Sequence, residues 1–179
     1  NGAPGAIASH VGLIFHEIAH NYFPFITGTN EKKNAWMDEG WAAFLPTDLV
    51  DQYDPDYDYK LRRIYSYEYA AGSETDLPLI TPSYSYNTGA TRLGFYNRPA
   101  VAYYELNELL GKEVFKKGLL EFVNRWAGKH PLPHDFFFTF NEIAGEDLSW
   151  FWKPWFYNLG YPDLKLINFR SESEFNKVW

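Results

Sequence analysis

The sequence contains no cysteine, which excludes several kinds of chemistry at once. Without thiols the chain can form no disulfide and can use neither a cysteine nucleophile nor a cysteine metal ligand. A metal site in this chain must therefore be built from histidine, aspartate and glutamate. The absence of cysteine does not indicate a cellular compartment, and no other feature of the sequence does so.

Basic residues are scarce. The chain has 16 Lys and Arg against 23 Asp and Glu, which gives a net charge of −7. Because binding to a phosphate backbone needs a basic surface, we expect no nucleic-acid partner. No stretch approaches the roughly 18 consecutive apolar residues of a transmembrane helix, so we also expect no membrane span. No signal peptide is visible.

Apolar and aromatic side chains are abundant. Hydrophobic residues make up 46% and aromatic residues 20% of the 179 residues, which is enough for one domain with a sizeable core. The aromatic excess favours a bulky core. The alternative is an aromatic-rich surface that binds carbohydrate or protein, in which Trp150, Trp152 and Trp155 would form an exposed row.

The most informative stretch lies near the start of the chain, where His16-Glu17-Ile18-Ala19-His20 forms a His-Glu-x-x-His pattern. On an α-helix His16 and His20 lie one turn apart on one face, so both imidazoles can point at one metal ion. Glu17 lies about 100° further round and can reach a water on that metal without being a ligand. Apolar residues surround the pattern between Ala6 and Phe23, which predicts a buried helix.

A catalytic zinc ion needs a third protein ligand, with the fourth position left open. The best candidate is Glu39, which follows His20 after eighteen residues within Trp36-Met37-Asp38-Glu39-Gly40. We predict that it lies in the first turn of a second helix, from about Ala35 to Leu45. Gly40 would allow this helix to approach the first one closely.

Together these two patterns resemble the gluzincin metallopeptidases of the aminopeptidase N and leukotriene hydrolase family, with Glu39 in the Trp-x-x-Glu-Gly context of that family. The resemblance implies that His16, His20 and Glu39 hold Zn²⁺ and that Glu17 is the general base. It also implies a mainly α fold, the helical part of a thermolysin-like catalytic domain, over residues 1–165. Residues 166–179 would be a C-terminal tail or the start of a following module.

A third match lies at Tyr96-Asn97-Arg98-Pro99-Ala100, which resembles the Tyr-x-Lys-Gly-Ala pattern of the family at the start of a helix. By this match the Tyr96 hydroxyl stabilises the oxyanion. Arg98 replaces the lysine and Pro99 the glycine, and proline suits the first position of a helix. The irregular segment 73–98 is predicted to be a wall of the substrate cleft.

Relatives commonly place an acidic residue about two turns after the glutamate ligand, where it orients a ligand histidine. The nearest acid here is Asp48, so the sequence leaves the partner of the ligand histidines open.

The family resemblance implies peptide hydrolysis, and it implies an aminopeptidase with a peptide substrate. The Gly-x-Met-Glu-Asn strand that holds the free amine in relatives is missing, as is the β part before the helix. An endopeptidase or an epoxide-hydrolase-like activity therefore stays open. Because the chain begins Asn1-Gly2-Ala3 without an initiator Met, we expect a fragment whose partners include further domains of the same protein. A non-catalytic module with a structural or vestigial zinc site is the other alternative, although a structural site would not need Glu17.

Overall fold

The computed structural model describes residues 5–160, which form helices joined by turns and loops, without a strand in that range. The predicted mainly α fold is therefore confirmed. The predicted boundary between residues 165 and 166 lies outside the described residues. In chain order the helical elements are α1 (Ala6–Ala19), η1 (Asn21–Ile26), α2 (Glu31–Asn34), η2 (Ala35–Met37), α3 (Glu39–Phe44), α4 (Thr47–Tyr53), α5 (Tyr59–Ala70), η3 (Ser83–Ser85), α6 (Thr88–Thr91), η4 (Arg92–Asn97), α7 (Arg98–Leu110), α8 (Lys112–Trp126), α9 (Pro133–Ala144), α10 (Ser149–Trp152) and η5 (Lys153–Tyr157).

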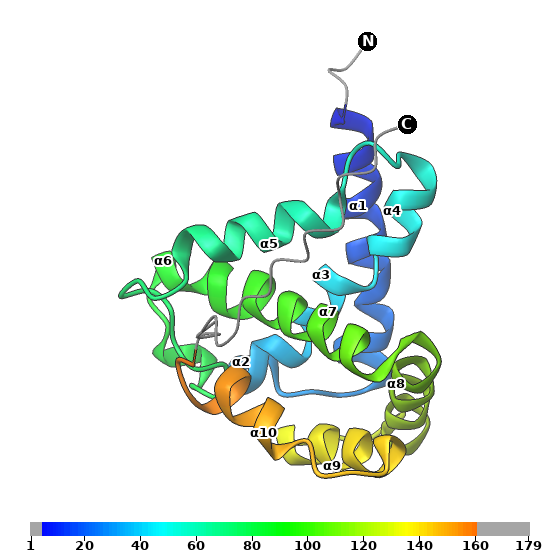
Figure 1. The fold of residues 1–179 in the computed structure, drawn as a ribbon, viewed down its shortest axis with the longest axis vertical. Coiled ribbons are helices and arrows are strands. Elements are labelled where there is room, and N and C mark those ends of the chain that lie inside the picture. The colour runs from blue at the N-terminus through cyan, green and yellow to red at the C-terminus, as the bar shows by residue number, and fades with distance from the viewer. Residues whose placement is uncertain (1–4, 161–179) are drawn as a thin grey trace, which may run out of the picture.

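Helix α7 runs through the middle of the molecule, and α3, α5, η4 and α8 pack against it (Figure 1). Pro99 lies in its first turn, where a missing N–H costs nothing. Gly111 ends it with a φ of 76°, which a residue with a side chain rarely adopts. The segment 98–104 is buried without a break, so α7 is the axis around which the other helices are arranged.

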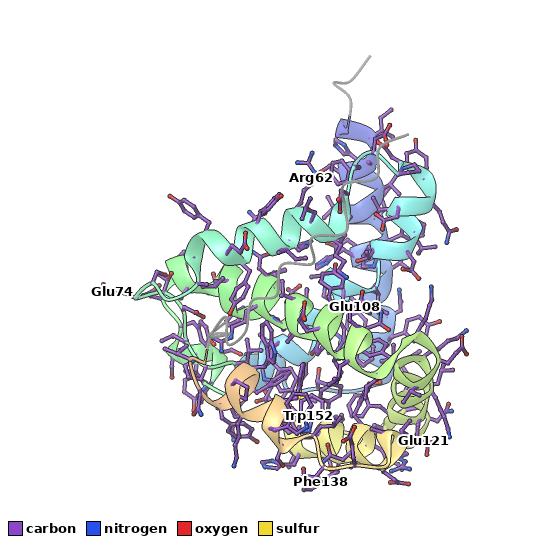
Figure 2. All side chains as sticks on the ribbon, viewed as in Figure 1. Arg62, Glu74, Glu108, Glu121, Phe138 and Trp152 are labelled. Atoms are coloured by element: carbon purple, nitrogen blue, oxygen red, sulfur yellow. The ribbon has the colours of Figure 1, made fainter. Side chains whose placement is uncertain are left out.

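The aromatic residues fill the core, as the bulky-core interpretation predicts. Trp41 stacks on Tyr103 with ring centroids 3.9 Å apart, and both rings are fully buried. Trp152, which is labelled in Figure 2, is buried as well, Trp155 is half-buried, and Trp150 is 58% exposed. The three tryptophans therefore do not form the exposed row that a binding surface would have.

The prediction of a fully buried first helix is wrong for this chain. Only one face of α1 packs, against α3 and α4, and its buried residues follow the helical spacing Ala8, Gly12, His16 and Ala19. The other faces leave large apolar side chains between 49% and 58% exposed, namely Ile7, Leu13, Ile14 and Ile18. An apolar pattern shows that a helix is suited to burial, but not which neighbours cover it.

The helix predicted from about Ala35 to Leu45 is broken into two elements, η2 and α3, and the short helix α2 precedes it. The break falls at Asp38, whose φ of −116° and ψ of −77° depart from helical values. Its carboxylate is hydrogen-bonded to a histidine, a tertiary contact that local helix propensity does not contain. Glu39 nevertheless lies in the first turn of α3, as predicted.

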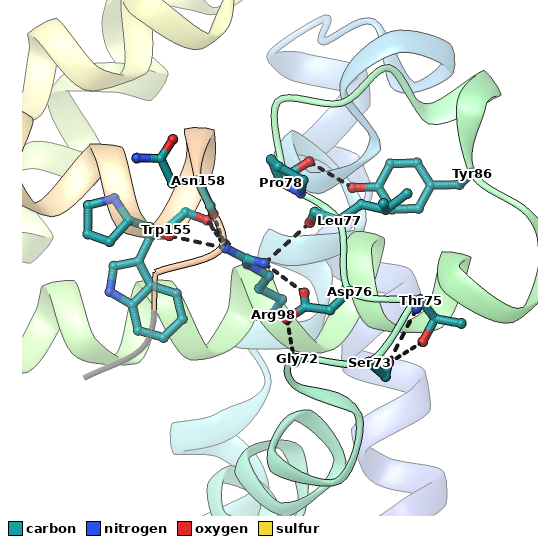
Figure 3. Close-up of polar contacts among 11 residues, drawn as sticks. Gly72, Ser73, Thr75, Asp76, Leu77, Pro78, Tyr86, Arg98, Trp155 and Asn158 are labelled. Carbon is teal, nitrogen blue, oxygen red and sulfur yellow. Dashed lines mark hydrogen bonds and ion pairs between the residues drawn. The ribbon is translucent and has the colours of Figure 1, made fainter. Parts of the chain in front are cut away.

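Segment 73–98 contains η3, α6 and η4. A buried ion pair between Asp76 and Arg98 holds this segment against the start of α7 (Figure 3). Arg98 Nη1 lies 2.6 Å from Asp76 Oδ1, and both side chains are completely buried. The other guanidinium nitrogens donate to the carbonyls of Pro154, Trp155 and Asn158. Arg98 thus joins the loop before α7 and the η5 segment to the start of α7.

Candidate metal site

The three predicted ligand side chains, His16, His20 and Glu39, converge between α1 and α3. His16 lies in the last turn of α1 and His20 caps it, so their rings meet edge to face with centroids 4.8 Å apart. Glu39, in the first turn of α3, presents Oε2 to both rings. This oxygen lies 3.2 Å from His16 Nε2 and 3.5 Å from His20 Nε2.

These atoms fit a metal ion. Ligands held at about 2.0–2.1 Å from a tetrahedral Zn²⁺ lie roughly 3.3 Å from one another, close to the two separations here. Glu39 Oε2 is buried and has no hydrogen-bond partner among residues 5–160, although two imidazole nitrogens approach it. A buried oxygen without a partner is costly, and a cation would satisfy it. Two histidines and one carboxylate are also a donor set typical of catalytic zinc.

Asp38 orients His20. The Nδ1–H of His20 donates to Asp38 Oδ1 at 2.8 Å and lies 3.0 Å from the carbonyl oxygen of Phe23. Since both partners are acceptors, the proton is on Nδ1 and the lone pair is on Nε2, which faces Glu39. The sequence did not predict this partner of His20. Asp48, the acid nearest to the position where relatives carry such a partner, instead pairs with the exposed Lys112.

The pKa shifts follow from the burial of this cluster. Burial alone would raise the pKa of Glu39, but His16, the Tyr96 hydroxyl and His20 outweigh it and lower the pKa. Burial raises the pKa of Asp38 to about 7, and His20 only partly offsets this. Burial acts to lower the pKa of His20, but the Phe23 carbonyl and the two carboxylates raise it overall. Of the two carboxyl groups, Glu39 and Asp38, Glu39 is therefore the one whose negative charge can attract a cation.

Tyr96 reaches the same cluster from η4. Its hydroxyl donates to Glu39 Oε1 at 2.7 Å, and its ring stacks on His16 with centroids 5.9 Å apart. Burial and the Glu39 carboxylate raise the pKa of Tyr96, so the phenol stays a neutral donor. Glu17 is exposed on α1 next to His16, and its charge also contributes to the raised pKa of Tyr96.

A cavity of about 580 Å³ opens beside His16 and Tyr96, between α1, α5 and η4. This volume lies within the usual range of ligand pockets. Of the segment 73–98, the residues that line it are Thr91, Arg92, Tyr96 and Asn97. The part of that segment nearest α7 therefore borders the cavity, while its earlier part is fastened by Asp76.

The helical fold and the convergence of His16, His20 and Glu39 agree with the metallopeptidase catalytic domain that the sequence resembles. The family described as Peptidase family M1 domain matches residues 5–155. The chain therefore belongs to peptidase family M1. Its fold matches the crystal structure of an M1 zinc metallopeptidase from Deinococcus radiodurans with a TM-score of 0.67 and 19% identity, over 86% of this chain and 34% of that one. A variant of the Deinococcus protein was solved with a Tyr-Ser-Ala substrate bound.

The curated relatives include proteins named as aminopeptidases. The protein named Probable aminopeptidase 1 of Sulfurisphaera tokodaii is 25% identical over 90% of this chain and 21% of its own length. Human aminopeptidase N is 26% identical over 65% of this chain and 13% of its own length. The chain thus spans about a fifth or less of these relatives. The predicted family is confirmed by the match to the M1 domain, and the predicted zinc cofactor is confirmed as the cofactor of that family. Within the described residues, no helix combines the length and the apolar character needed to span a bilayer.

Proposed function

We propose that this chain is the catalytic part of a zinc-dependent peptidase, and that the full protein removes residues from the N-terminus of peptides. The observation that carries the proposal is the convergence of His16 Nε2, His20 Nε2 and Glu39 Oε2 around one point. The aminopeptidase names of the relatives support the second part.

Each polar side chain of the cluster has a role in this proposal. His16, His20 and Glu39 would hold Zn²⁺, which would supply a Lewis acid for the scissile carbonyl and lower the pKa of a water. Glu17 accepts the proton of the attacking water and returns it to the leaving amine. The Tyr96 hydroxyl exchanges its bond to Glu39 for one to the developing oxyanion.

The role of Glu17 is tested with Glu17→Gln in the full protein. We expect turnover of a peptide to fall by about 100- to 10,000-fold, the usual share of general acid–base catalysis, while the zinc content stays unchanged. Glu113→Gln, on the exposed side of α8, is the matched control and should keep full turnover. Unchanged turnover in Glu17→Gln would rule out the base assignment. A wild-type protein that binds zinc and cleaves nothing would favour the non-catalytic module.

The role of Tyr96 is tested with Tyr96→Phe. We expect kcat to fall by about 100- to 1000-fold with little change in KM, because the lost hydrogen bond is made to the transition state. Tyr84→Phe, at a side chain that is 75% exposed, is the control.

A comparison of peptides with a free and an acetylated N-terminus decides between an aminopeptidase and an endopeptidase. Acetylation removes the free amine, so an aminopeptidase should no longer cleave the acetylated peptide, whereas an endopeptidase should cleave both.

A further inference from the structure

The cavity beside His16 and Tyr96 is lined by cationic side chains. Arg62 and Arg63 of α5 and Arg92 of η4 all line it, and no aspartate or glutamate is among its described lining residues. Within residues 5–160 none of these arginines forms an ion pair with a carboxylate. Three of the 16 basic side chains thus line one cavity of a chain whose net charge is −7.

The guanidinium group of Arg62 is held in place from one side. Its Nε donates to the carbonyl oxygen of Tyr57 at 2.9 Å, and its plane lies over the Tyr57 ring, 4.3 Å from the centroid. Figure 2 shows Arg62 at the end of α5 that lies near α1. These contacts orient the group but leave both terminal nitrogens without a hydrogen bond to a described residue.

Arg63 is oriented in a similar way, at a half-buried position. One terminal nitrogen donates to the Tyr59 hydroxyl at 2.8 Å and the other to Asn97 Oδ1 at 3.3 Å. A guanidinium carries five N–H groups, so three of them stay available. Asn97 follows Tyr96 directly, and this contact therefore links the arginine to the wall that carries Tyr96.

Such groups match a carboxylate. A planar guanidinium that is already oriented loses less entropy when it binds, and it can donate two parallel hydrogen bonds to a carboxylate. We infer that the arginines of this cavity bind a carboxylate of the peptide substrate, either an acidic side chain or the C-terminal carboxylate of a short peptide. The inference rests on the proposed peptidase function, because it assigns the substrate of that same site.

The test uses the zinc-loaded full protein and four tripeptides, Ala-Glu-Ala and Ala-Gln-Ala, each with a free or an amidated C-terminus. We expect the wild type to prefer the peptides with a carboxylate by about tenfold in kcat/KM, the size of one charge-assisted hydrogen bond. The double variant Arg62→Gln, Arg92→Gln changes two exposed side chains and should remove this preference. Arg63→Gln is the second variant, and Lys117→Gln on α8, which makes the same charge change per site, is the control.

The peptides separate the two sources of the carboxylate. A preference that follows the Glu residue assigns an acidic side chain, and one that follows the free C-terminus assigns the terminal carboxylate. An equal loss on all four peptides would show that the arginines only support the fold, and no loss in either arginine variant would show that they do not contact substrate. Either result overturns the inference.

Calorimetric binding of the same peptides separates this inference from the proposed function. If the wild type cleaves none of the four, the proposed function fails. Tighter binding of the carboxylate peptides that disappears in the arginine variants would still establish the carboxylate site, and equal binding of all four would overturn it.

Discussion

At the scale of single residues, Asp38 decides which nitrogen of His20 faces the candidate metal site. Its carboxylate accepts the Nδ1–H at 2.8 Å, which leaves Nε2 as the donor beside Glu39. Without this acceptor the ring could rotate or change tautomer, and a metal would lose an oriented ligand.

We therefore predict that Asp38→Ala weakens zinc binding by about 10- to 100-fold, as is typical when the partner of a ligand histidine is removed. Competition with a chromophoric chelator measures the affinity. Asp48→Ala removes an exposed acid that pairs with Lys112, and it should leave the affinity unchanged. Equal affinities of Asp38→Ala and the wild type would show that the Phe23 carbonyl alone suffices to orient the ring.

Residues that share one helical turn could be placed from the sequence, while long-range partners could not. The period of the helix alone puts His16 and His20 on one face, and the structure brings Glu39 to them. The bond between Asp38 and His20 depends on a break in the chain at Asp38, which no local pattern shows.

At the scale of elements, Gly40 sets the distance between α3 and α7. The sequence-based prediction assigned its close contact to the first helix, and that assignment was wrong. A Cβ at Gly40 would lie 2.7 Å from Pro99 Cβ and 3.2 Å from Tyr103 Cε2, both on α7. Since α3 carries Glu39 next to this contact, the packing of α3 on α7 also positions the ligand.

We predict that Gly40→Ala lowers the free energy of unfolding by about 1–3 kcal/mol, the usual cost of overpacking, and also weakens zinc binding. Urea unfolding followed by tryptophan fluorescence measures the first effect and chelator competition the second. Gly89→Ala is the control, because a Cβ at this exposed helical glycine would meet nothing closer than 3.4 Å. A stability loss with unchanged zinc affinity would separate the packing of α3 from the position of Glu39.

The ion pair between Arg98 and Asp76 joins elements that are distant in sequence. Arg98 occupies the position of the family lysine, but its partner lies 22 residues earlier and its other acceptors lie near residue 155. We predict that Arg98→Met destabilises the protein by about 3–5 kcal/mol in urea unfolding, because the buried Asp76 carboxylate loses its cation.

Two further variants check this prediction for Arg98. Adding Asp76→Asn to Arg98→Met should restore part of the stability, since the buried negative charge is then gone. Arg125→Met removes an arginine whose ion pairs with Glu121 and Glu142 are largely exposed, and it should cost little. A similar small loss for both arginine variants would mean that the Arg98 pair contributes no net stability.

At the scale of the whole molecule, the sequence could predict the fold class and the bulky core but not how each helix is covered. Aromatic density and helical periodicity are local properties, and they predicted a mainly α domain with buried rings, as the structure shows. The cover of α1 depends on which elements pack around it. Ile14 and Ile18 are about half exposed in this chain although the pattern around them suits burial.

A metal at this site would join α1 to α3, so its removal should affect the stability of the whole molecule. A ligand that binds only the folded state stabilises it by about 4 kcal/mol when its free concentration is 1,000 times its Kd. We predict that stripping zinc with a chelator lowers the Tm measured by calorimetry, and that added Zn²⁺ restores it. Glu39→Ala removes the oxygen that lies near both histidines, so its Tm should respond little to either treatment. An equal response of Glu39→Ala and the wild type would place the bound metal elsewhere in the protein.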